Sequence, residues 1–271
     1  MSEIAEQAGR PEPTFDIREV SGRRPGARSW LLLLETEWKL ILRDSAGMII
    51  PLGLPLLIMV MNGIGAASQR LPGTGGMTVM DGFVLPLVLV MVLATISVIN
   101  VPTNLAVYRK EGILRRLGVT PASPGMVLVA HLVVNLVQTL IGVALAVTVA
   151  ILAFDASLPR SLAAIGVFAL TCAAMYAIGT LLAAVAPSTN FALATGLVTF
   201  FGMMAVGGGF GSRESLPHWI ATVGSYSPFG AGMDTLGAAW VGAGADPGQL
   251  LALGITTVLA AGLALRLFRW T

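Results

Sequence analysis

The sequence predicts an all-α polytopic membrane protein with six transmembrane helices, and three observations support this fold class. Of its 271 residues, 55% are hydrophobic and only 11% are charged, less than half the charged fraction of an average soluble domain. The mean hydropathy is +0.83. Six separate runs are apolar over the roughly 20 residues that a helix needs to cross a bilayer. So little charge could not cover a water-facing surface without large exposed apolar patches, which excludes a soluble globular protein.

The six apolar runs share interiors free of charged residues, because a charge at the centre of a spanning helix costs about 3 kcal/mol. They cover residues 47–67, 82–107, 121–154, 161–186, 190–210 and 248–268. The third run is too long for one crossing, so we expect its helix to tilt or to extend beyond the bilayer. Residues 1–27 are polar and lack the apolar stretch of a signal peptide, so we expect a disordered cytosolic tail.

The distribution of basic residues predicts the orientation. With a cytosolic N-terminus, thirteen of the sixteen basic residues lie on the cytosolic side, and only Arg70, Arg160 and Arg213 lie outside. The positive-inside rule therefore places both termini in the cytosol. The net charge is only +2 and no basic face with interspersed aromatic residues is present, so no nucleic-acid partner is expected. Cys172 is the sole cysteine, which leaves neither an intrachain disulfide nor a thiolate metal cluster, and no metal site is predicted.

Residues 28–43 predict an amphipathic helix that lies along the membrane surface and contacts lipid. A tryptophan-rich apolar face opposite a basic stripe is typical of such interfacial helices. The apolar face holds Trp30, Leu34, Trp38 and Ile41, and the charged stripe holds Glu35, Lys39 and Arg43. Glu37 breaks this pattern. The alternative is a simple cytosolic extension of the first span.

The connection 108–120, with sequence YRKEGILRRLGVT, is the only strongly charged one between spans. On a helix its apolar residues share one side and its charged residues the other, and Glu111 can pair with Arg115 one turn later. The apolar side holds Ile113, Leu114 and Leu117, and the polar side holds Arg109, Glu111, Arg115 and Arg116. We interpret this segment as a cytosolic helix that docks a soluble partner. The alternative is a turn whose charges only fix the topology.

The outer segment 211–247 has apolar residues near helical spacing, interrupted by Pro217 and Pro228. It predicts short helices that lie at the outer leaflet or dip into it, where backbone at membrane depth persists only when it is buried in protein or faces a water-filled cavity. Gly207, Gly208 and Gly209 precede it. They predict either a bend and close backbone approach in the fifth span or simply the end of that helix.

The order of these features along the chain resembles that in the permease subunit of ABC type-2 exporters. This family contains bacterial drug-, antibiotic- and polysaccharide-export permeases. The most specific stretch, from Arg109 to Ser123, is similar to the family's coupling segment R-x-E-x-G-x-L-x-x-L-x-x-T-P-x-S, with the Glu and Gly slightly closer here. Residues 216–219, 227–229 and 234–236 are similar to the family's outer re-entrant helices. The resemblance covers residues 28–271, which we therefore treat as one transmembrane domain.

The resemblance implies a homodimer in the bacterial inner membrane that carries two copies of an ATPase chain and moves a hydrophobic or amphipathic substrate outward. It implies an ATPase-coupling role for the cytosolic segment, namely for Arg109, Lys110, Glu111, Gly112, Ile113, Leu114, Arg115, Arg116 and Leu117. In the family, the substrate route runs along the dimer interface, which implies that the first, second and fifth spans line the route in this chain. Candidate pathway residues there are Asn62, Asn100, Asn104, Met203 and Met204.

Polar residues inside the spans have two possible roles, which are substrate contact and hydrogen bonding between helices. Both apply to the asparagines of the pathway set and to Asn135 and Gln138, which share a face of the third span. His131 and His218 have no carboxylate neighbour in sequence, so neither a metal site nor a proton relay is expected.

The sequence contains no phosphate-binding loop of the form G-x-x-x-x-G-K-[ST], because its only lysines are Lys39, in WKL, and Lys110, in RKE. We therefore expect no cofactor in this chain and expect ATP and Mg²⁺ to be bound by the partner ATPase. The alternatives are an ion-coupled secondary transporter and a membrane-embedded lipid-modifying enzyme. Both need ionisable groups inside the spans, whereas the nearest acids, Asp81 and Asp155, lie at span boundaries.

Overall fold

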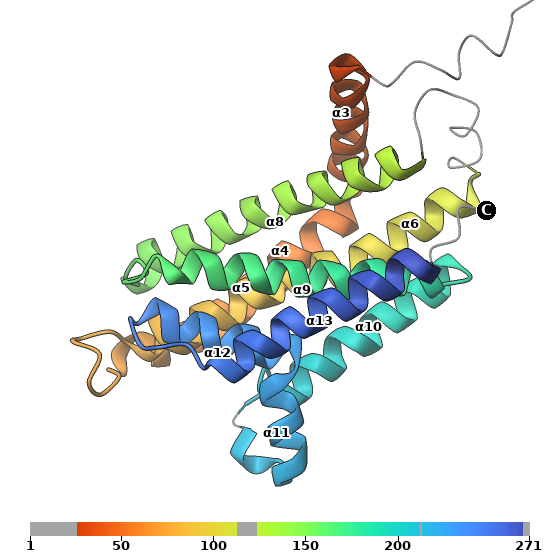
Figure 1. Ribbon diagram of the computed structural model, residues 1–271. Helices are drawn as coiled ribbons and strands as arrows, with labels where there is room; N and C mark the ends of the chain where they lie inside the picture. The colour runs from red at the N-terminus through yellow and green to blue at the C-terminus, as the bar shows by residue number, and fades with distance from the viewer. Residues whose placement is uncertain (1–25, 113–123, 212, 268–271) are drawn as a thin grey trace, which may run out of the picture.

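The computed structural model describes residues 26–112, 124–211 and 213–267, and this part of the chain is helical apart from turns and one isolated backbone bridge. Six helices are long and apolar enough to cross a membrane, which confirms the predicted fold class. Figure 1 shows them running side by side. They are α4 (Ser45–Ser68), the helix from Met80 to Lys110, α8 (Pro124–Phe154), α9 (Ala163–Val185), α10 (Thr189–Val206) and α13 (Pro247–Leu267).

The second span is the central helix of the bundle. It consists of η2 (Met80–Val84), α5 (Leu85–Ala94), η3 (Thr95–Asn100) and α6 (Val101–Lys110). In its most apolar stretch 83% of the residues are buried, whereas no other span exceeds 39%. Helices α4, α8, α9 and α10 therefore enclose this helix, and any movement of it must be transmitted through protein contacts.

Part of the central helix, η3, is π-helical, a local widening that is often found at functional sites. Two neighbouring helices approach its backbone through glycines. A Cβ on Gly179 of α9 would lie 1.8 Å from the Ser97 carbonyl oxygen, and one on Gly196 of α10 would lie 2.7 Å from that of Val98. Both helices thus rest directly on the backbone of η3, where no side chain fits.

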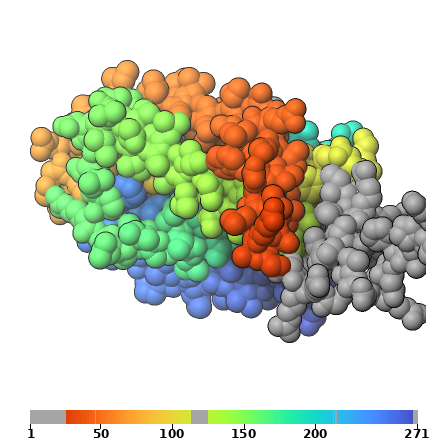
Figure 2. Space-filling view, turned by 90° about the horizontal axis from the view of Figure 1, so that it is seen from above, coloured from red at the N-terminus to blue at the C-terminus, as the bar shows by residue number. Residues whose placement is uncertain are grey.

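Helix α3 (Ala27–Arg43) precedes the first span and runs across the direction of the spans, over α8 (Figures 1 and 2). Asp44 separates α3 from α4, because its backbone is not helical and its side chain accepts a 3.0 Å hydrogen bond from the Gly47 amide. The segment is therefore not a simple extension of the first span. Of the predicted tail, residues 1–25 lie outside the described residues, and Ala27 already belongs to α3.

The charged stripe of α3 is exposed. Lys39 Nζ lies 2.6 Å from Glu35 Oε1, and this hydrogen bond, together with the lysine charge, holds the pKa of Glu35 below its usual range. Arg43 is exposed in the last turn, whereas Trp30 and Trp38 are half-buried.

Pro51 has a structural consequence at the start of the first span. Because proline has no N–H, the Gly47 carbonyl loses its usual partner one turn later in α4. Two side chains from other spans take its place: Asn100 Nδ2 donates to this oxygen at 2.7 Å and Gln138 Nε2 at 2.9 Å. For Asn100 and Gln138, the structure therefore shows hydrogen bonding between helices.

The segment after the fifth span folds back into the bundle. Helix α10 ends at Val206, before the predicted limit of residue 210, and Gly208 follows in a left-handed conformation with φ of 89°. Helix α11 (His218–Tyr226) is mostly exposed, whereas α12 (Pro228–Trp240) is buried along most of its length. The glycine run therefore ends the fifth span, and α12 packs among the spans (Figure 1).

We name the two ends of the bundle by their arginines. At the Arg109 end, α6 and α9 finish and α10 begins. At the Arg213 end, α8 and α10 finish, next to η4 (Arg213–Ser215), α11 and α12.

Candidate functional site

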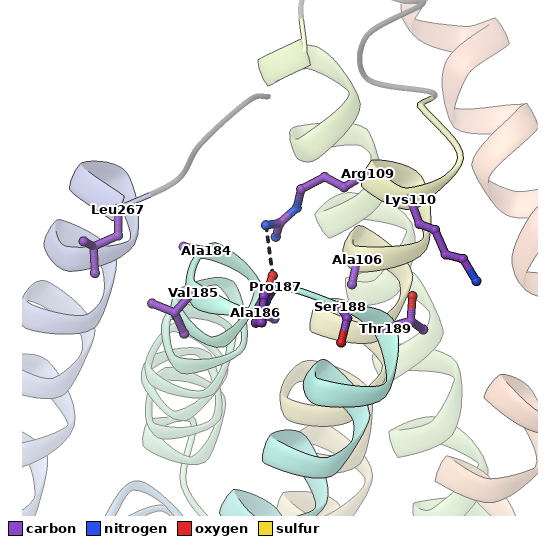
Figure 3. Close-up of a pocket in the computed structure, with 10 residues that line it drawn as sticks. All are labelled: Ala106, Arg109, Lys110, Ala184, Val185, Ala186, Pro187, Ser188, Thr189 and Leu267. Atoms are coloured by element: carbon purple, nitrogen blue, oxygen red, sulfur yellow. Dashed lines mark hydrogen bonds between the residues drawn. The ribbon is translucent and has the colours of Figure 1, made fainter.

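Arg109 joins the central helix to α9. It lies in the last turn of α6, and its guanidinium donates a hydrogen bond to the carbonyl oxygen of Ala183. It also donates one of 3.3 Å to the carbonyl oxygen of Ala186 (Figure 3). These carbonyls belong to the C-terminal end of α9, where helical acceptors have no partner within the helix and where positive charge is favourable. Arg109 therefore fixes the end of the central helix to the end of α9.

The structure corrects part of the predicted docking helix. Residues 108–110 continue α6 rather than starting a separate helix, and Gly112 has a left-handed φ of 66°, which ends the helical path. Arg109, which was predicted on the polar face of a separate helix, points toward α9, because the carbonyls at the end of α9 attract it. Lys110 is exposed. The remaining predicted coupling residues, Ile113, Leu114, Arg115, Arg116 and Leu117, lie outside the described residues.

A cavity of about 760 Å³ opens beside Arg109. Residues of α6, of the connection from α9 to α10 and of the end of α13 line it (Figure 3). The chain path between α9 and α10 reverses here at Pro187, and Ser188 accepts a 3.3 Å hydrogen bond from the Phe191 amide as the N-cap of α10. This end of the bundle thus presents a recess directly next to the residue where the predicted coupling segment begins.

A buried polar cluster connects α3, α6 and α8 at the same end. Glu37 Oε2 accepts a 2.7 Å hydrogen bond from the Tyr108 hydroxyl and lies 3.0 Å from His131 Nδ1. The rings of Tyr108 and His131 meet edge to face, with centroids 5.4 Å apart. Asn135 Nδ2 lies 3.1 Å from His131 Nε2 and donates to the His131 carbonyl at 2.8 Å. Glu37 is 4% exposed and His131 is 0% exposed.

His131 has no carboxylate neighbour in sequence, but the fold brings Glu37 to it over 94 residues of sequence. The sequence did contain a local signal for Glu37. This acid occupies a position on the same helix face as Trp30, Leu34 and Ile41, so it belongs to the inward face of α3 although it is charged. No local pattern links that face to the third span.

The five candidate pathway residues lie on three spans, and the hydrogen bonds and core contacts of the described residues do not join them into one cluster. Asn62 is exposed and donates to the Ile58 carbonyl of its own helix at 2.8 Å, and Asn104 is half-buried on α6. Met204 is 2% exposed within the core, and Met203 packs against the same core. Together with Asn100, which bonds to Gly47, these residues occupy three different spans.

The sequence matches the family described as ABC-2 type transporter over residues 28–239. The chain belongs to this family. The match begins in α3 and includes the first five spans and nearly all of α12. A comparison with curated proteins gives no match.

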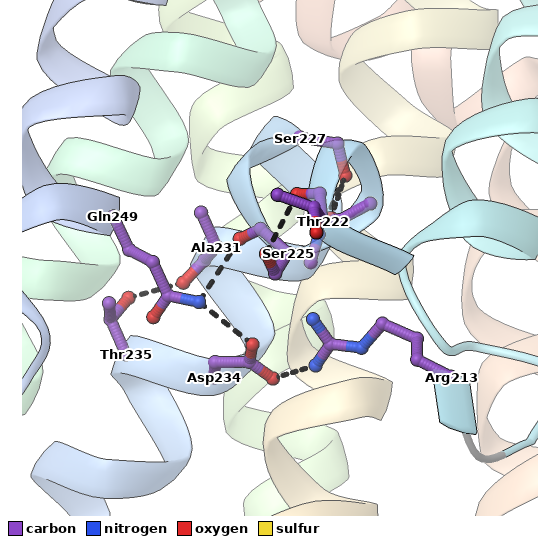
Figure 4. A network of polar contacts seen from close by, with 10 residues as sticks. Arg213, Thr222, Ser225, Ser227, Ala231, Asp234, Thr235 and Gln249 are labelled. Atoms are coloured by element: carbon purple, nitrogen blue, oxygen red, sulfur yellow. Dashed lines mark hydrogen bonds and ion pairs between the residues drawn. The ribbon is translucent and has the colours of Figure 1, made fainter. Parts of the chain in front are cut away.

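Within this ABC-2 transporter domain, a second polar cluster holds the Arg213 end together. Arg213 donates to Asp234 Oδ1, and Gln249 Nε2 donates to Asp234 Oδ2 at 2.9 Å and to the Ser225 carbonyl at 3.1 Å (Figure 4). The cluster therefore joins η4, α11 and α12 to the start of the last span.

Among the described residues, Asp81 is the one acid that is buried at the start of a span. Its carboxylate accepts hydrogen bonds of 2.8 Å from the Thr78 amide, 2.9 Å from the Thr78 hydroxyl and 2.7 Å from the Ser157 amide. It thereby ties the loop before the central helix to the connection between α8 and α9. In the described parts of the chain, no group of three or more His, Cys, Asp or Glu residues is placed to hold a metal ion.

Proposed function

We propose that this ABC-2 transporter domain is the permease subunit of an ATP-driven exporter, a homodimer that carries two ATPase subunits. The observation that carries the proposal is the continuity of the central helix, which runs from Met80 to Lys110 and leads directly into the segment that resembles a coupling segment. ATP and Mg²⁺ bind to the partner ATPase, because the sequence offers no phosphate-binding loop.

In this mechanism, closure of the ATPase dimer displaces residues 109–117. The displacement acts on α6, and Arg109 transmits it to α9 through the hydrogen bonds to the Ala183 and Ala186 carbonyls. Helix α9 in turn packs along α13 and α12, so the movement reaches the Arg213 end through protein contacts. Such coupling shifts the conformational equilibrium only if the ATPase contacts the inward-open and outward-open states differently.

The proposed substrate is hydrophobic or amphipathic, such as a drug, an antibiotic or a lipid-like molecule, and it moves from the Arg109 side to the Arg213 side. The scarcity of ionisable groups in the spans supports an apolar cargo. The concentration of basic residues near the Arg109 end supports a cytosolic location for that end in a bacterial inner membrane. Asn62 on α4 and Met203 on α10 are the pathway residues that we propose for substrate contact.

The orientation can be tested with single cysteines in a Cys172→Ala background. Cysteines at Ser68 and Gly244, which are exposed at the Arg213 end, should react with an impermeant thiol reagent added outside intact cells. A cysteine at Gly118 should react only after the membrane is opened. Labelling at Gly118 in sealed cells would contradict the proposed topology.

The partner can be tested with two substitutions in the coupling segment. Leu117→Asp should reduce both copurification of the ATPase and substrate efflux more than Arg116→Ala does, because a buried apolar anchor contributes more to affinity than a charge at the rim. Both variants are compared at equal membrane expression. If the loop serves only topology, Leu117→Asp will behave like the wild type, and the docking role of the segment is then refuted even though the family stands.

A further inference from the structure

The Glu37 carboxylate is a buried acid with a single titratable base next to it. Its Oε2 atom accepts the Tyr108 hydroxyl and faces His131 Nδ1, and all three side chains are less than 8% exposed. In the described part of the chain, His131 makes the only ion-pair contact with Glu37. An isolated carboxylate in such surroundings is costly unless a positive charge accompanies it.

The hydrogen-bond geometry suits a neutral His131 ring. Nδ1 faces an acceptor and Nε2 faces the amide nitrogen of Asn135, an arrangement that fits a single ring proton on Nδ1. With an ionised Glu37, the cluster then has one net negative charge. A second proton on Nε2 would give a net neutral ion pair, but it needs an acceptor.

An acceptor for that second proton lies next to the ring. The Oδ1 atom of Asn135 is buried and has no hydrogen-bond partner. Rotation of the Asn135 amide would present Oδ1 to Nε2–H, at the cost of the hydrogen bond that Nδ2 donates to the His131 carbonyl. Both ring nitrogens of His131 would then have a hydrogen-bond partner in either protonation state.

Other charges near the cluster do not neutralise Glu37. On α3, Lys39 pairs with Glu35 on the exposed side, and on α6, Arg109 is directed to the α9 carbonyls. Glu111, after α6, adds negative charge near Tyr108. His131 is the only ionisable residue of α8, and α4, α5 and η3, which also pack against α8, have none. The further charged residues on α3 and α6 are Arg28, Arg43 and Lys110.

We propose that Glu37 and His131 form a proton-binding site that controls how firmly α3 is attached to the spans. A proton taken up from water binds His131 Nε2 and converts a hydrogen bond with net negative charge into an ion pair. The attachment of α3 to α6 and α8 is then stronger at low pH and weaker as the proton leaves. Tyr108, which shares Glu37, lies immediately before Arg109, so the protonation state acts at the start of the proposed coupling segment.

The site can be observed directly because the chain has only two histidines. In full-length protein labelled with ¹⁵N-histidine and reconstituted in lipid nanodiscs, a His218→Gln variant leaves the signal of His131 alone. Spectra are recorded at about pH 6 and about pH 8, which bracket the range where histidine changes charge. At about pH 6, the ratio of doubly protonated to neutral His131 should be about tenfold lower in Glu37→Gln than with Glu37 present. An unchanged ratio would overturn the proposal.

Hydrogen–deuterium exchange of the α3 amides tests the mechanical consequence. After correction for intrinsic rates, α3 should exchange more slowly at about pH 6 than at about pH 8, and His131→Gln should remove this difference. Glu35→Gln is the matched control, because it removes an exposed carboxylate from the same helix and should leave the pH response intact. A pH response that persists in His131→Gln would show that another group is responsible.

Discussion

Replacing Gly179 by valine is expected to prevent the spans from assembling correctly. The new Cβ would lie 1.8 Å from the Ser97 carbonyl oxygen, a backbone atom that no side-chain rotation can move aside. Helix α9 would have to separate from the central helix along η3. We expect a destabilisation at or above the upper end of the about 1–3 kcal/mol typical of overpacked cores. The variant should show little monodisperse protein in detergent and a strongly lowered melting temperature.

Gly166 provides a control for the effect of adding a side chain to this helix. It lies in the same helix, and a Cβ there would meet nothing within 4 Å. Gly166→Ala should therefore fold as well as the wild type, since alanine favours a helix by about 1 kcal/mol over glycine. If Gly179→Val retained the wild-type melting temperature, the close contact between α9 and η3 would be refuted.

Replacing Arg109 by alanine is expected to lower substrate efflux about tenfold at equal membrane expression. The guanidinium makes charge-assisted hydrogen bonds to the end of α9, and such bonds contribute about 1.5–3 kcal/mol. A change of 1.4 kcal/mol is tenfold in an equilibrium, so loss of this contact would shift the balance between the coupled and uncoupled positions of α6 and α9. Efflux and ATP hydrolysis by the assembled complex should be measured together.

The control for Arg109 is Arg266→Ala, which removes an exposed arginine from α13 at the same end of the bundle. It should leave efflux unchanged. Arg109→Lys keeps the charge but not the planar group that reaches two carbonyls, so it should restore efflux only in part. Wild-type efflux in Arg109→Ala would contradict the role of this residue in transmission.

The helical architecture was predictable because its signal is local. An apolar run of membrane length and the spacing of Trp30, Leu34 and Ile41 each indicate a helix without knowledge of its neighbours. The end of the fifth span was harder to locate, because glycine at residue 207 is apolar enough to continue a hydrophobic run while its backbone ends the helix.

The candidate site was less predictable because its contacts are distant in sequence. Glu37 and His131 are 94 residues apart, and Arg109 and Ala183 are 74 apart. A contact between residues so far apart produces no periodic pattern in the sequence. Arg109 was expected among the other charges of its segment, since composition alone does not show that uncapped carbonyls lie within its reach. Gly179 is one of 32 glycines, and only the tertiary fold shows which of them must lack a side chain.

The proline at position 51 also bears on how the protein is made. Helix α4 is synthesised before the other five described spans, and its Gly47 carbonyl cannot be satisfied within the helix. Its two donors, Asn100 and Gln138, are synthesised 53 and 91 residues later. In a bilayer an unsatisfied backbone group is costly, so the nascent first span must keep this carbonyl near hydrated headgroups until the second and third spans are inserted. Biogenesis of this protein therefore favours the joint release of three spans into the lipid over the insertion of each one alone.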